Sequence, residues 1–198
     1  MIRVRRSGRG TMRCMETPAE TYRDGDLTLT RWQPGDRAVL TAVVSGSVAH
    51  LGEFLNWATG GYTDDDSAEF LRLTAKRWES GEAYEYALSA GSALAGGIGV
   101  MQRDGGVEIG YWLALGFVGR GLMTRAVTLL TEEAFRLGAG YVEIKHDERN
   151  VRSGAVPARL GFTRVRTEPA EKPLAPACTG TNHVWRLARR PCSAPAAP

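Results

Sequence analysis

Two periods of apolar positions run along this chain and predict different secondary structures. Strict alternation of apolar and polar residues indicates a strand, whereas apolar residues three and four positions apart indicate a helix. The segment 27–32, Leu-Thr-Leu-Thr-Arg-Trp, alternates and predicts a first strand. The helical period is clearest over 121–137, and Gly138 and Gly140 end it. The apolar face of that helix consists of Leu122, Ala126, Leu129, Leu130, Ala134 and Leu137.

The remaining elements follow from the same two periods. Further helices are expected over roughly 37–46, 48–55, 67–78 and 152–160. Further strands are expected at 84–89, 94–101, 107–114, 141–145 and 183–187, with another that starts at Phe162. Ala90-Gly91 and the run 103–106 are hairpin signals. An antiparallel meander followed by β-α-β-α-β-β predicts a mixed α/β (α+β) fold.

The length of 198 residues suits one well-buried domain better than two. We expect this domain at 25–189, after a flexible arm at 1–24 and before a disordered tail at 190–198 that is rich in Pro and Ala. The arm is rich in Arg, but no apolar stretch of ~7–15 residues follows its basic part, so a secretory signal is not expected. Met12 and Met15 are alternative start sites.

Composition narrows the class of protein. A hydrophobic content of 43% and a charged content of 24% are ordinary for a globular protein. No apolar run approaches the ~20 residues that cross a bilayer, so a membrane protein is disfavoured. The net charge of +3 is mild, which makes nucleic-acid binding an unlikely function. Cys14, Cys178 and Cys192 show neither pairing nor metal-ligand spacing, which favours a cytoplasmic protein without a metal site.

The segment 108–124 carries the chemistry. A strand runs into a turn that contains Gly119 and Gly121, and a helix starts at once. This arrangement points several backbone N–H groups and the positive end of a helix dipole at one spot, where Arg120 and Thr124 could add side-chain donors. A pyrophosphate is the natural ligand, although a Gly-x-Gly pair alone is equally compatible with a structural turn.

A nicotinamide dinucleotide is disfavoured at this turn. The dinucleotide fingerprint needs a third glycine, and Thr124 stands in that position. The strand is also preceded by hairpins, so it is not the first strand of a β-α-β unit.

The segment 108–124, together with 150–162, Asn-Val-Arg-Ser-Gly-Ala-Val-Pro-Ala-Arg-Leu-Gly-Phe, resembles the GNAT superfamily of acetyltransferases. Leu55-Asn56-Trp57 is similar to the Rim-type branch, the ribosomal-protein N-terminal acetyltransferases and their relatives. The resemblance covers about residues 25–188. One position departs from the wider superfamily, which has Gln or Arg where this chain has Gly116; the Rim-type branch often lacks that residue too.

The resemblance implies a GNAT fold, a mixed and mostly antiparallel sheet of about seven strands in which 107–114 splays from 141–145 and acetyl-CoA fills the gap. It implies that Leu113 and Ala114 pair with the pantetheine arm and polarise the thioester carbonyl, and that Asn150 and Ser153 lie beside the sulfur. It also implies a pyrophosphate loop made of Val118, Gly119, Arg120, Gly121, Leu122, Met123 and Thr124.

Acyl transfer requires a neutral amine, and a carboxylate can accept the proton. The resemblance favours Glu108 as this base, and the alternative for Glu108 is an inter-strand ion pair. Glu168 and Glu171, in the loop after the Gly-Phe strand, are rivals. Ser153 is expected to donate a hydrogen bond to the departing thiolate, or else to act as a helix N-cap.

Three further residues are candidates for the surroundings of the site. His146 follows a strand and is expected to be a solvated loop histidine, although contact with substrate is the alternative. Trp57 and Tyr62 lie where the family lines its acceptor pocket, and ordinary packing is the alternative for both.

The predicted function is acetyl transfer from acetyl-CoA to a primary amine, with a protein N-terminus as the preferred acceptor. A small amine, such as a polyamine, an amino acid or an aminoglycoside, is the alternative acceptor. A non-catalytic acyl-CoA sensor is the alternative from another class. A homodimer is common in this branch and stays open here.

Overall fold

The computed structural model describes residues 16–189, so the expected tail and most of the expected arm lie outside the described residues. The strands are β1 (Thr21–Asp24), β2 (Leu27–Arg31), β3 (Ala83–Ala90), β4 (Ala93–Arg103), β5 (Gly106–Leu113), β6 (Tyr141–Asp147), β7 (Thr163–Pro169) and β8 (Thr181–Ala188). The helices are α1 (Arg37–Ser45), α2 (Val48–Leu51), α3 (Asp64–Ser80), α4 (Leu122–Arg136) and α5 (Val151–Arg159). Short 3-10 turns lie at Pro34–Asp36, Asn56–Ala58 and Leu115–Phe117.

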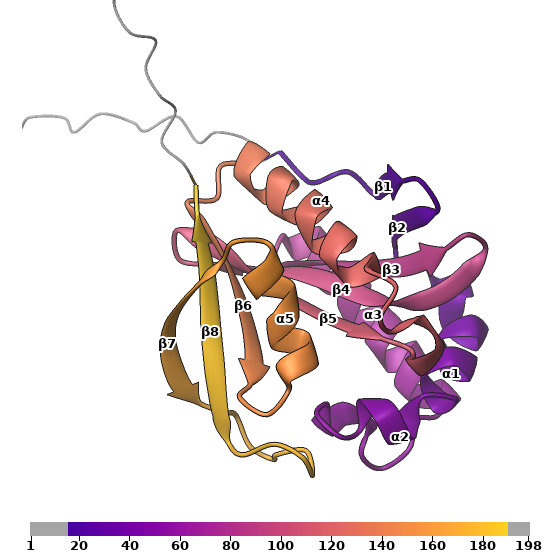
Figure 1. Cartoon of the computed structure of the whole chain (residues 1–198). Coiled ribbons are helices and arrows are strands. Elements are labelled where there is room, and N and C mark those ends of the chain that lie inside the picture. The colour runs from indigo at the N-terminus through magenta and orange to yellow at the C-terminus, as the bar shows by residue number, and fades with distance from the viewer. Residues whose placement is uncertain (1–15, 190–198) are drawn as a thin grey trace, which may run out of the picture.

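All of these strands form one sheet in the order β1-β2-β3-β4-β5-β6-β8-β7. Only β5 and β6 pair in parallel, and every other neighbouring pair is antiparallel. The mixed, mostly antiparallel sheet that the sequence predicts is therefore confirmed. α4 and α5 cover one face of the sheet, in the foreground of Figure 1, whereas α1 and α3 pack on the opposite face.

Two apolar clusters fill the space between the helices and the sheet. The larger one joins Ala126 and Leu130 of α4 to Ile109 and Ile144, which are at most 2% exposed. The smaller one joins Leu40 of α1 and its neighbours to the β3–β4 half of the sheet. Within residues 16–189, none of the helices combines the length and the apolar character that a bilayer crossing requires.

Within residues 16–189 the sheet has eight strands, where about seven were expected, because residues at the end of the predicted arm form β1. β1 pairs with β2 through a tight turn in which Gly25 has a φ of +56°. Arg125 of α4 binds the carboxylates of Asp24 and Asp26 at 2.7 and 2.9 Å. These contacts bring residues 21–24 into the domain, although the sequence there carries no strand period.

The second helix is also shorter than expected. α2 ends at Leu51 and a 3-10 turn follows at Asn56–Ala58, whereas the sequence predicts one helix over 48–55. A Cβ on Gly52 would lie 2.9 Å from the carbonyl oxygen of Val48 and 3.1 Å from that of Ala58. The chain therefore folds back closely over Gly52, which excludes a continuous helix.

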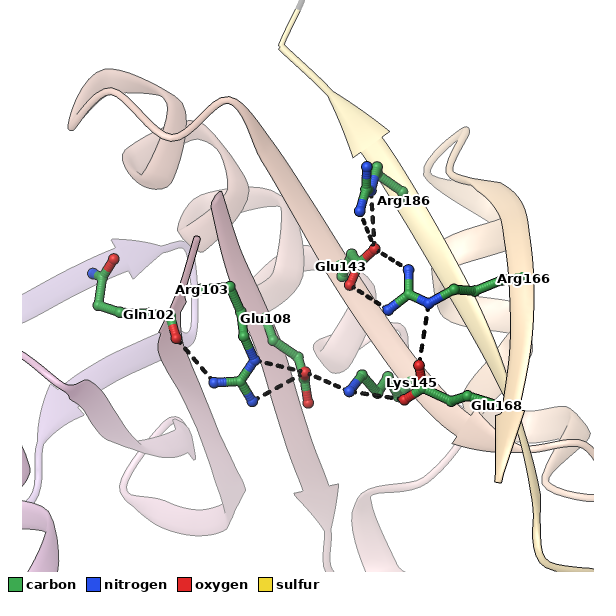
Figure 2. Close-up of polar contacts among 8 residues, drawn as sticks. All are labelled: Gln102, Arg103, Glu108, Glu143, Lys145, Arg166, Glu168 and Arg186. Carbon is green, nitrogen blue, oxygen red and sulfur yellow. Dashed lines mark hydrogen bonds and ion pairs between the residues drawn. The ribbon is translucent and has the colours of Figure 1, made fainter. Parts of the chain in front are cut away.

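A charged cluster lies where β6, β7 and β8 meet, on the face opposite α4 (Figure 2). Glu143 is 3% exposed and receives hydrogen bonds from Arg166 at 2.6 and 3.1 Å and from Arg186 at 2.7 and 2.9 Å. Burial by itself would raise the pKa of Glu143, but the two guanidinium groups outweigh it and hold that pKa below its usual value. The cluster therefore ties three strands together through one carboxylate.

Replacing Glu143 with alanine is expected to lower the free energy of unfolding by about 1.5–3 kcal/mol, the usual contribution of a hydrogen bond to a charged group. Because the folded pKa lies below the unfolded value of ~4.3, this contribution is present above that pH and disappears as the pH falls through the folded pKa. Urea unfolding between about pH 7 and about pH 3.5 measures it. Glu132→Ala, at an exposed position of α4, is the control and should change stability by less than about 0.5 kcal/mol. An equal loss in both variants would contradict the assignment.

Candidate active site

The glycine turn after β5 has the geometry of an anion site. Gly119 and Gly121 have φ values of +83° and +73°, a region in which glycine is strongly favoured. Gly121 is also the N-cap of α4 and offers no side chain to its first turn, so the amides of that turn are left for a ligand. A Cβ on either glycine would meet nothing within 4 Å, which leaves open space above the turn.

The other residues of the predicted loop take different places. Leu122 and Met123 are buried in the core, so they can contribute only backbone N–H groups. Arg120 is exposed and its guanidinium lies over the ring of Phe117, 5.0 Å from the centroid. Thr124 and Val118 are partly buried. The turn therefore presents a row of amides with Arg120 as the charged side chain beside it.

A wedge opens between β5 and β6. The two strands pair only at Val107–Ile109 with Val142–Ile144, after which β6 continues to Asp147 beside β8 while β5 leaves it. Ala114 donates its N–H to Ala95 at 2.9 Å on the β4 side and accepts from Phe117 at 3.0 Å. Because successive amides of a strand point to opposite sides, the backbone groups of Leu113 and Tyr111 face the wedge. The structure thus brings Leu113 to the open edge, whereas both backbone groups of Ala114 are used within the protein.

The N-terminus of α5 stands across the wedge. Asn150 caps α5, because its Oδ1 accepts from the backbone N–H of Ser153 at 3.1 Å. The alternative interpretation of Ser153 as the N-cap is therefore wrong. The Ser153 hydroxyl donates to the Tyr111 hydroxyl at 3.3 Å, and Tyr111 donates to the Ser153 carbonyl oxygen at 3.0 Å. Burial raises the pKa of Tyr111 to about 12, so its phenol stays protonated.

Glu108 lies before the wedge opens, in the paired part of β5 (Figure 2). Its Oε2 is 3.1 Å from Arg103 and 3.1 Å from Lys145, and Lys145 also binds Glu168 at 2.9 Å. This is the inter-strand ion pair that the sequence left as the alternative for Glu108. Glu171 is exposed in the loop after β7. None of these three carboxylates lines the cavity described below.

His146 is not the solvated loop residue that the sequence predicts. β6 extends to Asp147 because it pairs with β8 along its whole length, so His146 belongs to the strand and is 8% exposed. Its Nε2 accepts a hydrogen bond from Trp185 at 2.9 Å, and burial lowers its pKa. His146 therefore packs as a neutral residue beneath α5, where a Cβ on Gly154 would come within 2.5 Å of it.

A cavity of about 510 Å³ lies on the α1–α3 face of the sheet. Gly110, Tyr111 and Trp112 of β5 line it, and these residues follow the point where β5 leaves β6. Trp57 and Tyr62, expected at the acceptor pocket, are among its walls. The other aromatic wall residues are Trp32 and Phe70. The size and the apolar walls are those of a small-molecule or side-chain pocket.

Sequence reasoning missed two residues of this region. Tyr111 could have been found from strand alternation, because it lies two residues after Ile109 and therefore on the same face of the strand. Glu85 of β3 lines the cavity, and nothing in the linear pattern of its neighbours distinguishes it. Among residues 16–189, no group of three or more His, Cys, Asp or Glu side chains could hold a metal ion, and Cys178 is a free thiol.

A wedge between two central parallel strands that leads to an uncapped helix N-terminus defines the acyl-CoA-binding class of transferases. The family model described as "Acetyltransferase (GNAT) domain" matches residues 26–163, so the chain belongs to the GNAT acetyltransferases. It is 30% identical over 141 residues to "Putative ribosomal N-acetyltransferase YdaF" of Bacillus subtilis (strain 168), a match that covers 69% of this chain and 77% of that protein. The expected family, its Rim-type branch and the enzyme class are confirmed.

Solved structures agree on the fold. The microcin C7 self-immunity acetyltransferase MccE, solved with acetyl-CoA and AMP, superposes with a TM-score of 0.78 at 20% identity over 84% of this chain and 94% of that one. RimL, the ribosomal L7/L12 α-N-protein acetyltransferase solved with coenzyme A, superposes with a TM-score of 0.77 at 21% identity, covering 83% and 95%. The co-substrate is acetyl-CoA, as the sequence predicts, and the open glycine turn suits its pyrophosphate.

Replacing Gly121 with alanine is expected to weaken acetyl-CoA binding about 10-fold, because a left-handed φ costs alanine about 1–2 kcal/mol and the new methyl group enters the space above the turn. Calorimetric titration with acetyl-CoA measures the affinity. Gly91→Ala is the matched control, since Gly91 has a φ of +61° in open space at the β3–β4 turn. Equal affinity in all three proteins would exclude the turn as the pyrophosphate site.

Proposed function

We propose that this acetyltransferase transfers acetyl groups from acetyl-CoA to primary amines by direct attack, and that its acceptor is the N-terminal amine of a protein. The observation that carries the proposal is the wedge, which has a cofactor turn at one end, a hydroxyl pair across it and a cavity on its far side. The names of YdaF and RimL support a ribosomal protein as the acceptor. A cytoplasmic location and a homodimer stay predictions.

The reaction forms one C–N bond and breaks one C–S bond. The lone pair of the amine attacks the carbonyl carbon of the thioester, the nitrogen gives up a proton, and the sulfur leaves as a thiolate that takes up a proton. An α-amine has a pKa near ~7.7–8.0 and a lysine side chain one near ~10.4, so the α-amine requires less help to reach its neutral form. This difference favours a protein N-terminus over a lysine side chain.

The backbone of Leu113 and Tyr111 is placed to bind the thioester carbonyl, because its donors face the wedge. Donors fixed in this way stabilise the negative charge that develops on the carbonyl oxygen. The Ser153 and Tyr111 hydroxyls are placed to protonate or hydrogen-bond the thiolate, since both remain neutral donors and lie on opposite sides of the opening. These roles need no covalent enzyme intermediate.

Several groups are candidates for the base that accepts the amine proton. Glu108 remains the candidate from the family resemblance, and its carboxylate already binds two cations. A carboxylate held between Arg103 and Lys145 can reach the amine only if those contacts rearrange. For an α-amine acceptor, a water in the wedge could carry the proton away without a dedicated carboxylate.

Removing either hydroxyl of the pair is expected to lower kcat by about 10-fold or more, in line with the contribution of a positioned proton donor. Tyr111→Phe removes the acceptor of the Ser153 hydroxyl, and Ser153→Ala removes the donor to Tyr111, which keeps its bond to the Ser153 carbonyl oxygen. Because the two hydroxyls are bonded to each other, the double variant should lose little more than either single variant. Thiol release under saturating acetyl-CoA measures kcat, and calorimetry should show unchanged acetyl-CoA affinity. Full activity in both single variants would remove the pair from the mechanism.

The proposed function is tested by thiol release with acetyl-CoA against N-terminal peptides, polyamines, amino acids and aminoglycosides. Turnover of peptides alone supports the proposal. Turnover of a small amine alone would show that the acceptor is a small amine and not a protein N-terminus. Tight acetyl-CoA binding without any turnover would favour a sensor. Glu108→Gln, assayed beside the wild type, tests the base. Loss of turnover with unchanged stability would assign this role to Glu108. Retained turnover would show that Glu108 serves only in the ion pair with Arg103 and Lys145.

A further inference from the structure

Two glycines of β4 hollow the sheet beneath the cavity. A Cβ on Gly97 would lie 2.6 Å from the indole nitrogen of Trp112, and a Cβ on Gly99 would lie 2.0 Å from a carboxylate oxygen of Glu85. The Trp112 and Glu85 side chains therefore lie flat across β4, each over a glycine. Glu85, Gly99 and Gly110 form one row across β3, β4 and β5 in the strand register. The row points the carboxylate toward the open part of β5.

The Glu85 carboxylate has no partner in the part of the chain that the structure describes. Within residues 16–189, no side chain donates a hydrogen bond to it, and the one charge that bears on its pKa is Arg77. Arg77 itself binds Glu82 at 3.3 Å. Burial raises the pKa of Glu85. A carboxylate in such a place is stabilised when a cation or a hydrogen-bond donor enters the cavity.

Two further polar groups of the cavity show that Glu85 is exceptional. Asp66 also lines the cavity, but its carboxylate accepts from the Thr63 hydroxyl at 2.6 Å and from the Thr63 backbone at 2.8 Å, as part of a helix cap. Trp32 is 4% exposed, and its indole nitrogen has no hydrogen-bond partner among the described residues. Among the described residues, the cavity walls thus include the unpaired Glu85 carboxylate and the buried, unpaired indole N–H of Trp32, which points to a ligand with polar atoms.

The walls of the cavity favour positive charge. Trp57 packs edge-on against Tyr62 and Trp112, with ring centroids 5.8 and 6.1 Å apart, and Trp32 packs against Phe70 at 5.7 Å. Aromatic faces attract ammonium and guanidinium groups and also accept the alkyl chains that carry them. Trp57 is 46% exposed, so solvent reaches this side of the aromatic group. Aromatic walls around an unpaired carboxylate form a site for a cation on an apolar stem.

We propose that this cavity binds a second, non-reacting cationic group of the acceptor, with Glu85 as its counter-ion. The inference rests on the proposed acetyl transfer to a primary amine. The Glu85 carboxylate lies over Gly99, which pairs with Gly110 of β5, and Leu113 is three residues farther along that strand, roughly 10 Å at ~3.4 Å per residue. The carboxylate is therefore placed away from the thioester, where it can bind a second group of the acceptor and not the reacting nitrogen. The acceptor class is therefore an amine whose reacting nitrogen and second positive charge are joined by an apolar stem.

Two sources supply this chemistry, a peptide that begins with lysine or arginine and a free alkyl diamine. The first measurement is kcat/KM for peptides that differ only in a first residue of lysine or norleucine, together with 1,5-diaminopentane and n-pentylamine. We expect the cationic member of the preferred pair to be favoured by about 10–100-fold, the usual effect of a charge-assisted hydrogen bond. Preference within the peptide pair or within the amine pair identifies the source.

Glu85→Gln keeps the shape of the side chain and removes its charge, so it should abolish this preference while leaving the neutral acceptor within about threefold. Gly99→Ala displaces the same carboxylate and should act in the same direction. Glu82→Gln is the matched control, because it removes an exposed charge three residues away, outside the cavity. Thermal unfolding and acetyl-CoA affinity, both expected to be unchanged in Glu85→Gln, show that the variant is folded.

The inference is overturned if wild-type protein shows no preference for the cationic acceptors, or if Glu85→Gln lowers both members of a pair equally. A total absence of turnover would be a failure of the proposed function instead. In that case tryptophan fluorescence of the CoA-loaded protein decides the inference. Binding of 1,5-diaminopentane that weakens at least about 10-fold in Glu85→Gln supports it, and equal affinity in the two proteins overturns it.

Discussion

The short parallel pairing of β5 with β6 is the constraint on which the rest of the site depends. Three residues of each strand pair, and then β6 continues beside β8 while β5 turns away. The divergence leaves backbone groups of β5 without a partner strand, and such groups must be satisfied by a ligand or by water. The hydroxyl contacts between Tyr111 and Ser153 join the two sides of the opening. A longer parallel ladder would close the wedge in which the acyl donor is predicted to bind.

β5 separates the predicted cofactor turn from the proposed acceptor cavity because its side chains alternate between faces. Ile109 packs under α4, on the side of the cofactor turn, whereas Gly110 and Trp112 face the cavity on the α1–α3 side. The glycines of β4 deepen that second side, since any larger residue at Gly97 or Gly99 would displace Trp112 or Glu85. The strand thus presents one face to the helix that follows the predicted pyrophosphate turn and the other to the proposed acceptor cavity.

Local sequence signals were enough to predict the cofactor turn, whereas they gave no indication of the proposed acceptor cavity. The turn with Gly119 and Gly121 is contiguous in sequence, so its glycines and the helix after it could be read directly. Glu85 stands between two tyrosines in an alternating strand and looks like a solvent-facing residue. Its position beside the cavity becomes clear only from the register of three strands, which places Gly99 and Gly110 in one row with it. His146 was misplaced for the same reason, because pairing with β8 lengthens β6 beyond its own apolar pattern.

Within residues 16–189, the glutamates of the sheet fall into two groups, those whose carboxylates bind cations of the protein and one, Glu85, whose carboxylate does not. Glu143 and Glu108 each bind two cations, and Glu168 shares Lys145 with Glu108 and Arg166 with Glu143, so these charges are neutralised within the protein. Replacing such groups affects the packing of strands first. Glu85 lacks this neutralisation although it is partly buried in an apolar cavity, and an uncompensated carboxylate there costs folding free energy. A filled cavity would compensate this charge, which is why the proposed acceptor site is placed at Glu85 and not at the paired glutamates.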